Sequence, residues 1–214
     1  MISPIVSPNK LAADKEIKVP RKKSVKKSAR DFLSHADELR QFVDGAAQGL
    51  TDQQKSWCYD YAIIRLYREF EQMMLSAIVG AINNDTTTIS STTGVDFPQH
   101  LTDEVCEYLV LGGNYFDFKG RDGLIKILKK FVPDNHYLVV IVKKNKYKLT
   151  LERLSALRNY AAHESYQSKR AALAAIGQER VGTAGSWLKL QGRYAAISDS
   201  LKELASEVAN DAPY

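Results

Sequence analysis

Apolar positions recur at helical rather than strand spacing along most of this chain. The clearest case is residues 53–83, which contain no proline and a single glycine. Two apolar series run through this segment at steps of three and four, one through Ile63 and Phe70 and the other through Ile64 and Tyr67. Because the two series together cover a wide face, they predict a long helix that is buried between others.

The same spacing, interrupted by polar or glycine-containing breaks, predicts the remaining elements. Further helices are expected at residues 31–49, 99–111, 121–131, about 150–175 and about 187–208. Residues 84–98, rich in Thr, Ser, Asp and Asn, predict a loop, and Thr51 and Thr150 are candidate helix caps. Residues 137–142 have strand propensity, but their helical surroundings favour a short buried helix. The fold class expected from this pattern is all-α.

The positive charge of the chain is concentrated in two zones. The net charge is +5, yet residues 10–30 hold nine Lys or Arg against Asp14 and Glu16, and residues 119–148 hold nine against two Asp. Residues 1–30 also have few large apolar side chains, which predicts a disordered basic tail before a helical domain at residues 31–214. Each zone is explained equally well by a solvated surface or by an attraction for phosphate groups.

Several functional classes are disfavoured by the sequence. No run approaches the ~20 apolar residues that a membrane-spanning helix needs, and the first residues do not resemble a secretory signal. With only two cysteines, a disulfide framework is not expected, and a cytoplasmic location is the default expectation. His35, His100 and His136 show no metal-ligand spacing, so neither a metal nor a cofactor is predicted.

The segment from Arg158 to His163, Arg-Asn-Tyr-Ala-Ala-His, carries the most specific candidate chemistry. On a helix, Leu151, Leu154 and Leu157 form an apolar stripe, while Asn159 and His163 share a face turned away from it. Arg158 lies at the edge of the stripe, roughly 140° round the helix from His163. A second copy of the helix packed against this face would bring the two kinds of side chain together.

These residue types suit RNA cleavage without a metal. RNA carries its own nucleophile, the 2′-OH, so a histidine that titrates near neutral pH can act as the base or the acid. An arginine supplies fixed, forked donors to a phosphate, and Asn159 can orient His163 or hold the phosphate. The expected products are a 2′,3′-cyclic phosphate and a 5′-OH.

The segment Leu157 to Glu164 resembles the motif of HEPN domains, in which an Arg is followed after four to six residues by a His. Leu66-Tyr67-Arg68-Glu69-Phe70-Glu71 is similar to the first core helix of the same family, and the likeness covers roughly residues 50–175. HEPN domains are helical bundles that usually form dimers, and many are metal-independent endoribonucleases of toxin–antitoxin and antiphage systems. The resemblance therefore implies a homodimer with Arg158 and His163 of both protomers in one composite site.

Other residues are candidates for supporting roles. Glu71 projects from the apolar face of its helix and should be paired, with Arg158 as the expected partner, either to position the Arg or as a purely structural ion pair. Lys143, Lys144, Lys146 and Lys148 precede the motif helix and either guide RNA toward it or form a solvated loop. Some HEPN toxins carry a modifiable Tyr two residues after the His, but Ser165 stands there in this chain, which argues against that regulation.

The sequence thus predicts an endoribonuclease that acts on RNA as a toxin or antiphage effector, with an antitoxin or another defence protein as a possible partner. A non-catalytic HEPN module that binds RNA or a protein is the main alternative. A DNA-associated member of a defence complex, which uses the basic tail as an arm, is a third.

Overall fold

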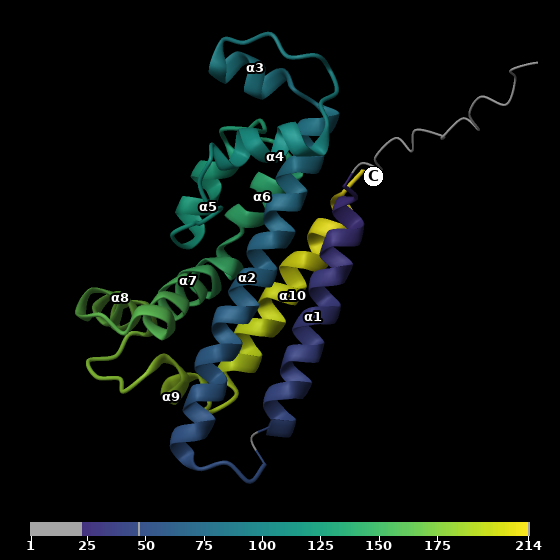
Figure 1. Ribbon diagram of the computed structural model, residues 1–214. Coiled ribbons are helices and arrows are strands. Elements are labelled where there is room, and N and C mark those ends of the chain that lie inside the picture. Colours follow the sequence, from purple (N-terminus) through teal and green to yellow (C-terminus); the bar gives the residue numbers. More distant parts are fainter. Residues whose placement is uncertain (1–22, 47, 214) are drawn as a thin grey trace, which may run out of the picture.

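The computed structural model describes residues 23–46 and 48–213, and all regular secondary structure in those ranges is helical (Figure 1). The all-α class predicted from the hydrophobic pattern is therefore confirmed. No helix within these described residues is both long and apolar enough to cross a membrane.

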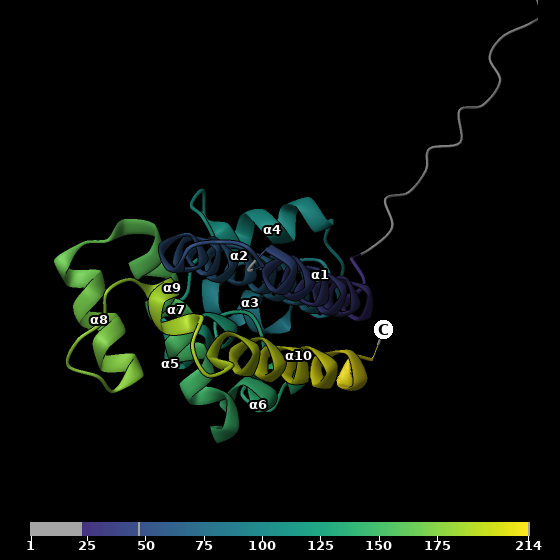
Figure 2. The same ribbon diagram turned by 90° about the horizontal axis from the view of Figure 1, so that it is seen from below.

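Three long helices run alongside one another and form the body of the molecule (Figures 1 and 2). They are α1 (Val25–Ala46), α2 (Asp52–Asn84) and α10 (Arg193–Asp211), and α1 packs against both of the others. Phe32 of α1 meets Phe70 of α2 edge to face, with ring centres 5.8 Å apart. This geometry favours aromatic pairs beyond the burial of their area, so it helps to fix how the two helices cross.

The long helix predicted for residues 53–83 is confirmed as α2. Thr51 begins it with a capping box, in which the Thr51 side chain accepts from the backbone N–H of Gln54 and the Gln54 side chain accepts from that of Thr51. Both predicted apolar series contribute buried side chains, among them Ile63, Phe70 and Tyr67. The helix is covered on several sides because α1, α4, α7 and α9 all pack against it.

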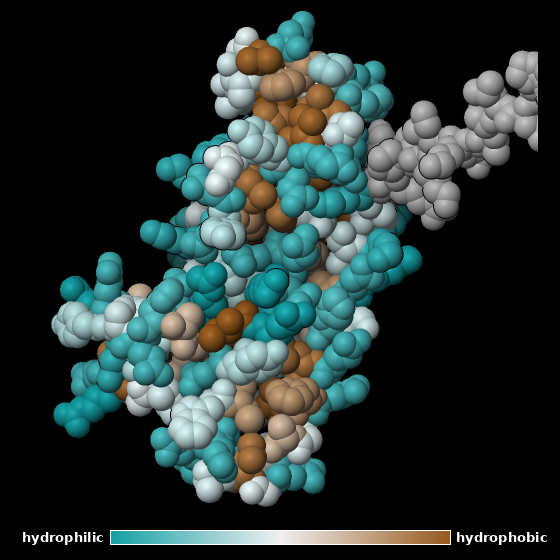
Figure 3. Space-filling model, in the orientation of Figure 1, coloured by the Kyte–Doolittle hydropathy of each residue, from teal (hydrophilic) through white to brown (hydrophobic). Residues whose placement is uncertain are grey.

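Shorter elements surround this body. In chain order they are α3 (Thr87–Thr93), α4 (Asp103–Leu111), α5 (Gly120–Leu128), α6 (Tyr137–Lys143), the 3₁₀ turn η1 (Asn145–Tyr147), α7 (Lys148–His163), α8 (Tyr166–Ile176) and α9 (Ala184–Leu188). The structure resolves the ambiguity at residues 137–142 in favour of a short helix, α6, in which four of the seven side chains are buried. On the face shown in Figure 3, apolar side chains appear in separate patches among hydrophilic ones.

Four predicted boundaries are wrong. The helix expected at about 150–175 is broken after His163, and the one expected at about 187–208 is divided into α9 and α10. The loop expected at residues 84–98 contains α3. Thr150 lies inside α7, which begins at Lys148, and its hydroxyl donates to Ser200 of α10 instead of capping the helix. Capping and tertiary hydrogen bonds decide these points, and the hydrophobic period does not report them.

The predicted tail also has a different end. Residues 1–22 lie outside the described residues, while α1 begins at Val25 and so includes the last part of the segment predicted as tail. Val25 and Ala29 are fully buried, which anchors this first turn in the core.

Candidate functional site

The Arg158–His163 segment lies on helix α7, and the apolar stripe of that helix determines which of its side chains are buried. Leu151, Leu154 and Leu157 are fully buried as predicted, and α7 packs against α2, α5 and α8. Arg158 is half-buried next to this stripe, whereas His163 is exposed at the last position of the helix.

The guanidinium of Arg158 is held against α2. Its central carbon lies 4.3 Å from the centre of the Tyr67 ring, within the range of a cation–π interaction. Its Nη1 donates to the side-chain oxygen of Asn159 at 2.7 Å. Because both contacts restrict the side chain while it stays partly exposed, Arg158 is pre-positioned and its remaining donors can meet an anion.

Glu71 lies in the same cavity as Arg158, one helical turn after Tyr67 on α2. Burial raises the pKa of Glu71 to about 7, against the opposing effect of the Arg158 charge, while the nearby Asp117 raises it further. No direct ion pair between Glu71 and Arg158 occurs among the described residues, so the predicted partnership is an electrostatic interaction across the cavity. Oε1 of Glu71 is buried without a hydrogen-bond partner in the described part of the chain.

The cavity between α2, α7 and the segment after α4 has a volume of about 580 Å³. Its lining residues are Ile64, Tyr67, Arg68, Glu71, Gln72, Leu75, Leu111, Asn114, Tyr115, Phe116, Asp117 and Arg158. Arg68 is exposed and also lines this cavity.

Tyr67 and Asp117 are site residues that sequence reasoning missed. The hydroxyl of Tyr67 donates to Asp117 Oδ1 at 2.7 Å and accepts from the backbone N–H of Phe118 at 3.3 Å. Burial raises the pKa of Tyr67, and so does its hydrogen bond to Asp117, which keeps the phenol protonated. The sequence places Tyr67 in the apolar pattern of α2 and in the segment that resembles the HEPN family, but neither gives its side chain a role in the site. Asp117 lies in an irregular segment where no periodic signal could have found it.

His163 stands apart from the cavity. The helix ends there because Glu164 adopts a left-handed conformation with φ 45°, after which Ser165 caps α8 in a capping box with Ser168. His163 follows Arg158 by five positions, which on a helix is roughly 7.5 Å along the axis and 140° round it. One chain therefore brings together Arg158, Asn159 and Glu71, but it does not bring His163 to them.

Asn159 faces a second hollow on the other side of Arg158. This hollow, about 440 Å³, lies between α7 and α8 and also includes Lys119 and Glu152. Asn159 lines this hollow, and its hydrogen bond to Arg158 links it to a residue that lines the larger cavity.

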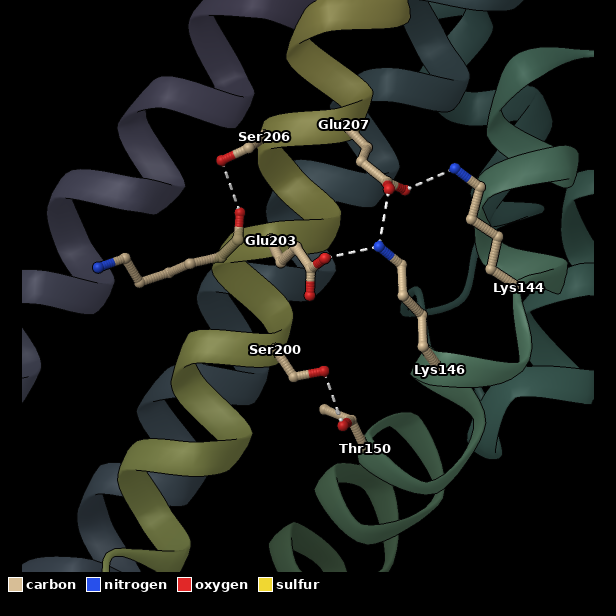
Figure 4. A network of polar contacts seen from close by, with 8 residues as sticks. Lys144, Lys146, Thr150, Ser200, Glu203, Ser206 and Glu207 are labelled. Atoms are coloured by element: carbon tan, nitrogen blue, oxygen red, sulfur yellow. Dashed lines mark hydrogen bonds and ion pairs between the residues drawn. The ribbon is translucent and has the colours of Figure 1, made fainter.

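The four candidate RNA-binding lysines lie at the opposite end of α7 from His163. Lys146 pairs with Glu203 at 2.6 Å and Glu207 at 2.9 Å, and Lys144 pairs with Glu207 at 3.1 Å (Figure 4). Lys143 lies 3.9 Å from Asp134, and Lys148 is exposed in the first turn of the helix. Because Lys148 is about 22 Å along the helix from His163 and the glutamates offset much of the charge, these lysines do not adjoin the motif.

Within residues 23–46 and 48–213, no group of three or more His, Cys, Asp or Glu side chains is arranged to hold a metal ion. No family model matches this chain, and searches of curated proteins and of solved structures give no significant match.

Proposed function

We propose that this protein is a metal-independent endoribonuclease of the HEPN type that acts as a homodimer in the cytoplasm. The observation that carries the proposal is the arrangement around Arg158. Its guanidinium is fixed by the Tyr67 ring and Asn159, with the Glu71 carboxylate in the same cavity, and His163 is exposed on the same helix. The helical spacing of α2 had suggested Glu71 as a partner of Arg158, either to position the Arg or as a structural ion pair.

The reaction needs a base, an acid and a stabiliser of negative charge. The imidazole of one His163 takes the proton of the 2′-OH, and the 2′-oxygen then bonds to phosphorus. The P–O5′ bond breaks, and the protonated His163 of the second protomer gives its proton to the 5′-oxygen. The two Arg158 guanidiniums bind the phosphate oxygens and offset the charge that develops on them. The products are a 2′,3′-cyclic phosphate and a 5′-OH.

A dimer supplies what one chain lacks. In a two-fold interface the same helix faces meet, so a contact through the exposed end of α7 places the His163 of one protomer near the Arg158 of the other. The role that we propose in toxin–antitoxin or antiphage defence, and any antitoxin partner, rests on the HEPN resemblance alone.

The test is RNA cleavage in the presence of EDTA. Wild-type protein should degrade single-stranded RNA, and His163→Ala should lower the rate by at least ~10²-fold because it removes the general base. His35→Ala is the matched control, since that imidazole is also exposed but lies on α1 and contacts Glu69. Equal cleavage by the His163→Ala and wild-type proteins would contradict the proposal.

Two other outcomes support the alternatives. RNA binding by wild-type protein with no cleavage favours a non-catalytic binding module. Tighter binding of duplex DNA than of RNA, lost when residues 1–30 are deleted, favours the role in a DNA-associated complex.

A further inference from the structure

The cavity beside Arg158 has the composition of a site for a small ligand. Its walls are largely apolar, through Ile64, Leu75 and Leu111, and its volume of about 580 Å³ lies within the range of ligand pockets. A few polar groups converge in it. Tyr115 stands at its edge with 97% of its surface exposed, an unusual position for a large aromatic side chain that contributes nothing to the core.

One side chain in this cavity has a carboxyl oxygen without a hydrogen-bond partner. Oε1 of Glu71 is buried and has no hydrogen-bond partner among the described residues. Leaving a buried carboxylate oxygen unpaired is costly, and such atoms are uncommon in folded proteins. The Glu71 side chain as a whole is partly exposed and lines the cavity, so N–H groups of a ligand can approach its carboxyl there.

A cation stands on the same helix face. Arg68 lies three residues before Glu71 on α2 and lines the same cavity, and its charge acts on the Glu71 carboxylate. The ligand face that fits the two side chains therefore has N–H donors opposite the carboxylate and an acceptor opposite the guanidinium.

We propose that this cavity binds an unstacked guanine base of the single-stranded RNA that the proposed ribonuclease cleaves. Guanine presents N1–H and an N2 amino group side by side, both directed at Glu71, and its neighbouring O6 accepts from Arg68. The exposed ring of Tyr115 stacks on the base, as aromatic side chains do with splayed-out bases of single strands. This inference rests on the proposed function, because it places the base of a nucleotide near the phosphate that Arg158 binds.

The other bases fit less well. Adenine and cytosine each place one donor beside an acceptor, and uracil places its single N–H between two acceptors. Each of them would set an acceptor against the carboxylate of Glu71 or offer it one donor fewer than guanine does. Guanine alone among the four has two adjacent donors followed by an acceptor along one edge.

Binding is measured with the full chain carrying His163→Ala, so that no probe is cleaved. The probes are fluorescein-labelled pentanucleotides UUGUU, UUAUU, UUCUU and UUUUU, and their affinities are compared by fluorescence anisotropy. UUGUU should bind roughly tenfold more tightly than the others, and replacing its guanine by inosine, which lacks the N2 amino group, should remove much of that advantage. Equal affinity for the four pentanucleotides would overturn the inference.

Protein variants separate the contributions. Glu71→Gln should abolish the preference for guanine and shift it toward adenine, because an amide offers one acceptor and one donor. Arg68→Ala, at an exposed position, should weaken guanine selectivity without altering the fold. Tyr115→Ala should weaken all four probes by a similar factor, since stacking is tolerant of sequence. Tyr108→Ala, on α4 outside the cavity lining, is the matched control and should change nothing.

These binding results are independent of cleavage. A guanine preference in a protein whose wild-type form does not cleave RNA refutes the ribonuclease proposal and leaves the base site standing. Cleavage of RNA with no base preference in binding would refute the base site and leave the ribonuclease proposal standing. A guanine preference that persists unchanged in both Glu71→Gln and Arg68→Ala would contradict the assignment of the site to this cavity.

Discussion

Glu71 is the residue on which much of the site's electrostatics depends. It is a carboxylate on the apolar face of a long helix, with Arg158 nearby and no direct ion pair between them among the described residues. Since burial dominates the attraction of the cation, its pKa rises to about 7. Helical spacing fixes the face from which Glu71 projects, so its position could be predicted, whereas the ion pair expected with Arg158 is replaced by an electrostatic interaction across the cavity.

The raised pKa of Glu71 makes the stability of the protein depend on pH. The folded protein holds the proton more tightly than the unfolded chain, so the stabilising contribution is complete below about pH 4.5 and is lost as pH rises through about 7. The shift corresponds to roughly 3 kcal/mol at most, which solvent screening of this partly exposed group reduces to roughly 1–2 kcal/mol. Glu71→Gln should therefore be more stable than wild type at pH 8 and similar to it at pH 4.5.

Urea unfolding of both proteins at the two pH values measures this difference. Glu38→Gln, at an exposed position of α1, serves as the control and should leave the pH dependence unchanged. A wild-type protein and a Glu71→Gln variant with parallel pH profiles would contradict this account of the cavity.

At the scale of elements, the closest packing around any glycine of the described chain occurs where α9 contacts α2. A Cβ built on Gly185 would lie 1.9 Å from the backbone oxygen of Ser56, and the N–H of Gly185 donates to Asp60 at 2.6 Å. Burial raises the pKa of Asp60, and the hydrogen bond from Gly185 opposes that rise. Only a residue without a Cβ allows α9 to dock on α2 in this way.

Gly185→Ala should destabilise the protein by about 2–3 kcal/mol or more, because two backbones must separate to admit the methyl group. Gly45→Ala is the matched control, since a Cβ there meets nothing within 4 Å and its φ is not positive. That variant should be neutral or slightly more stable. Thermal unfolding compares the two, and similar melting temperatures for them would show that α9 does not pack as described.

The ends of the helices differ in how well the sequence predicts them. Periodicity located α2 and α4 closely because their apolar positions are regular and Thr51 and Gly112 mark clear ends. It predicted one helix from about residue 150 to 175, although α7 ends at His163. That break depends on the backbone conformation of Glu164 and on the Ser165–Ser168 capping box. The pair of serines three residues apart was the one local sign of that break.

At the scale of the whole molecule, the sequence predicted part of the site. Arg158 and Glu71 come from helices whose faces are set by their spacing, so their place near one another in the same cavity could be anticipated. The walls supplied by residues 114–117 could not, because they belong to an irregular segment whose path is set by tertiary packing. Lys144 and Lys146 illustrate the reverse case, since a charge count cannot reveal that they form ion pairs with Glu203 and Glu207 of α10 (Figure 4).

The chemical ends of the RNA products test the central claim most directly. Wild-type protein is incubated in EDTA with an RNA oligonucleotide, and with the same oligonucleotide carrying a single 2′-deoxy sugar at the mapped cleavage position. We expect a 2′,3′-cyclic phosphate and a 5′-OH from the first and no cleavage at that position in the second, because the 2′-OH is the nucleophile. Cleavage of the deoxy-substituted position, or products with a 5′-phosphate, would contradict the mechanism built on Arg158 and His163.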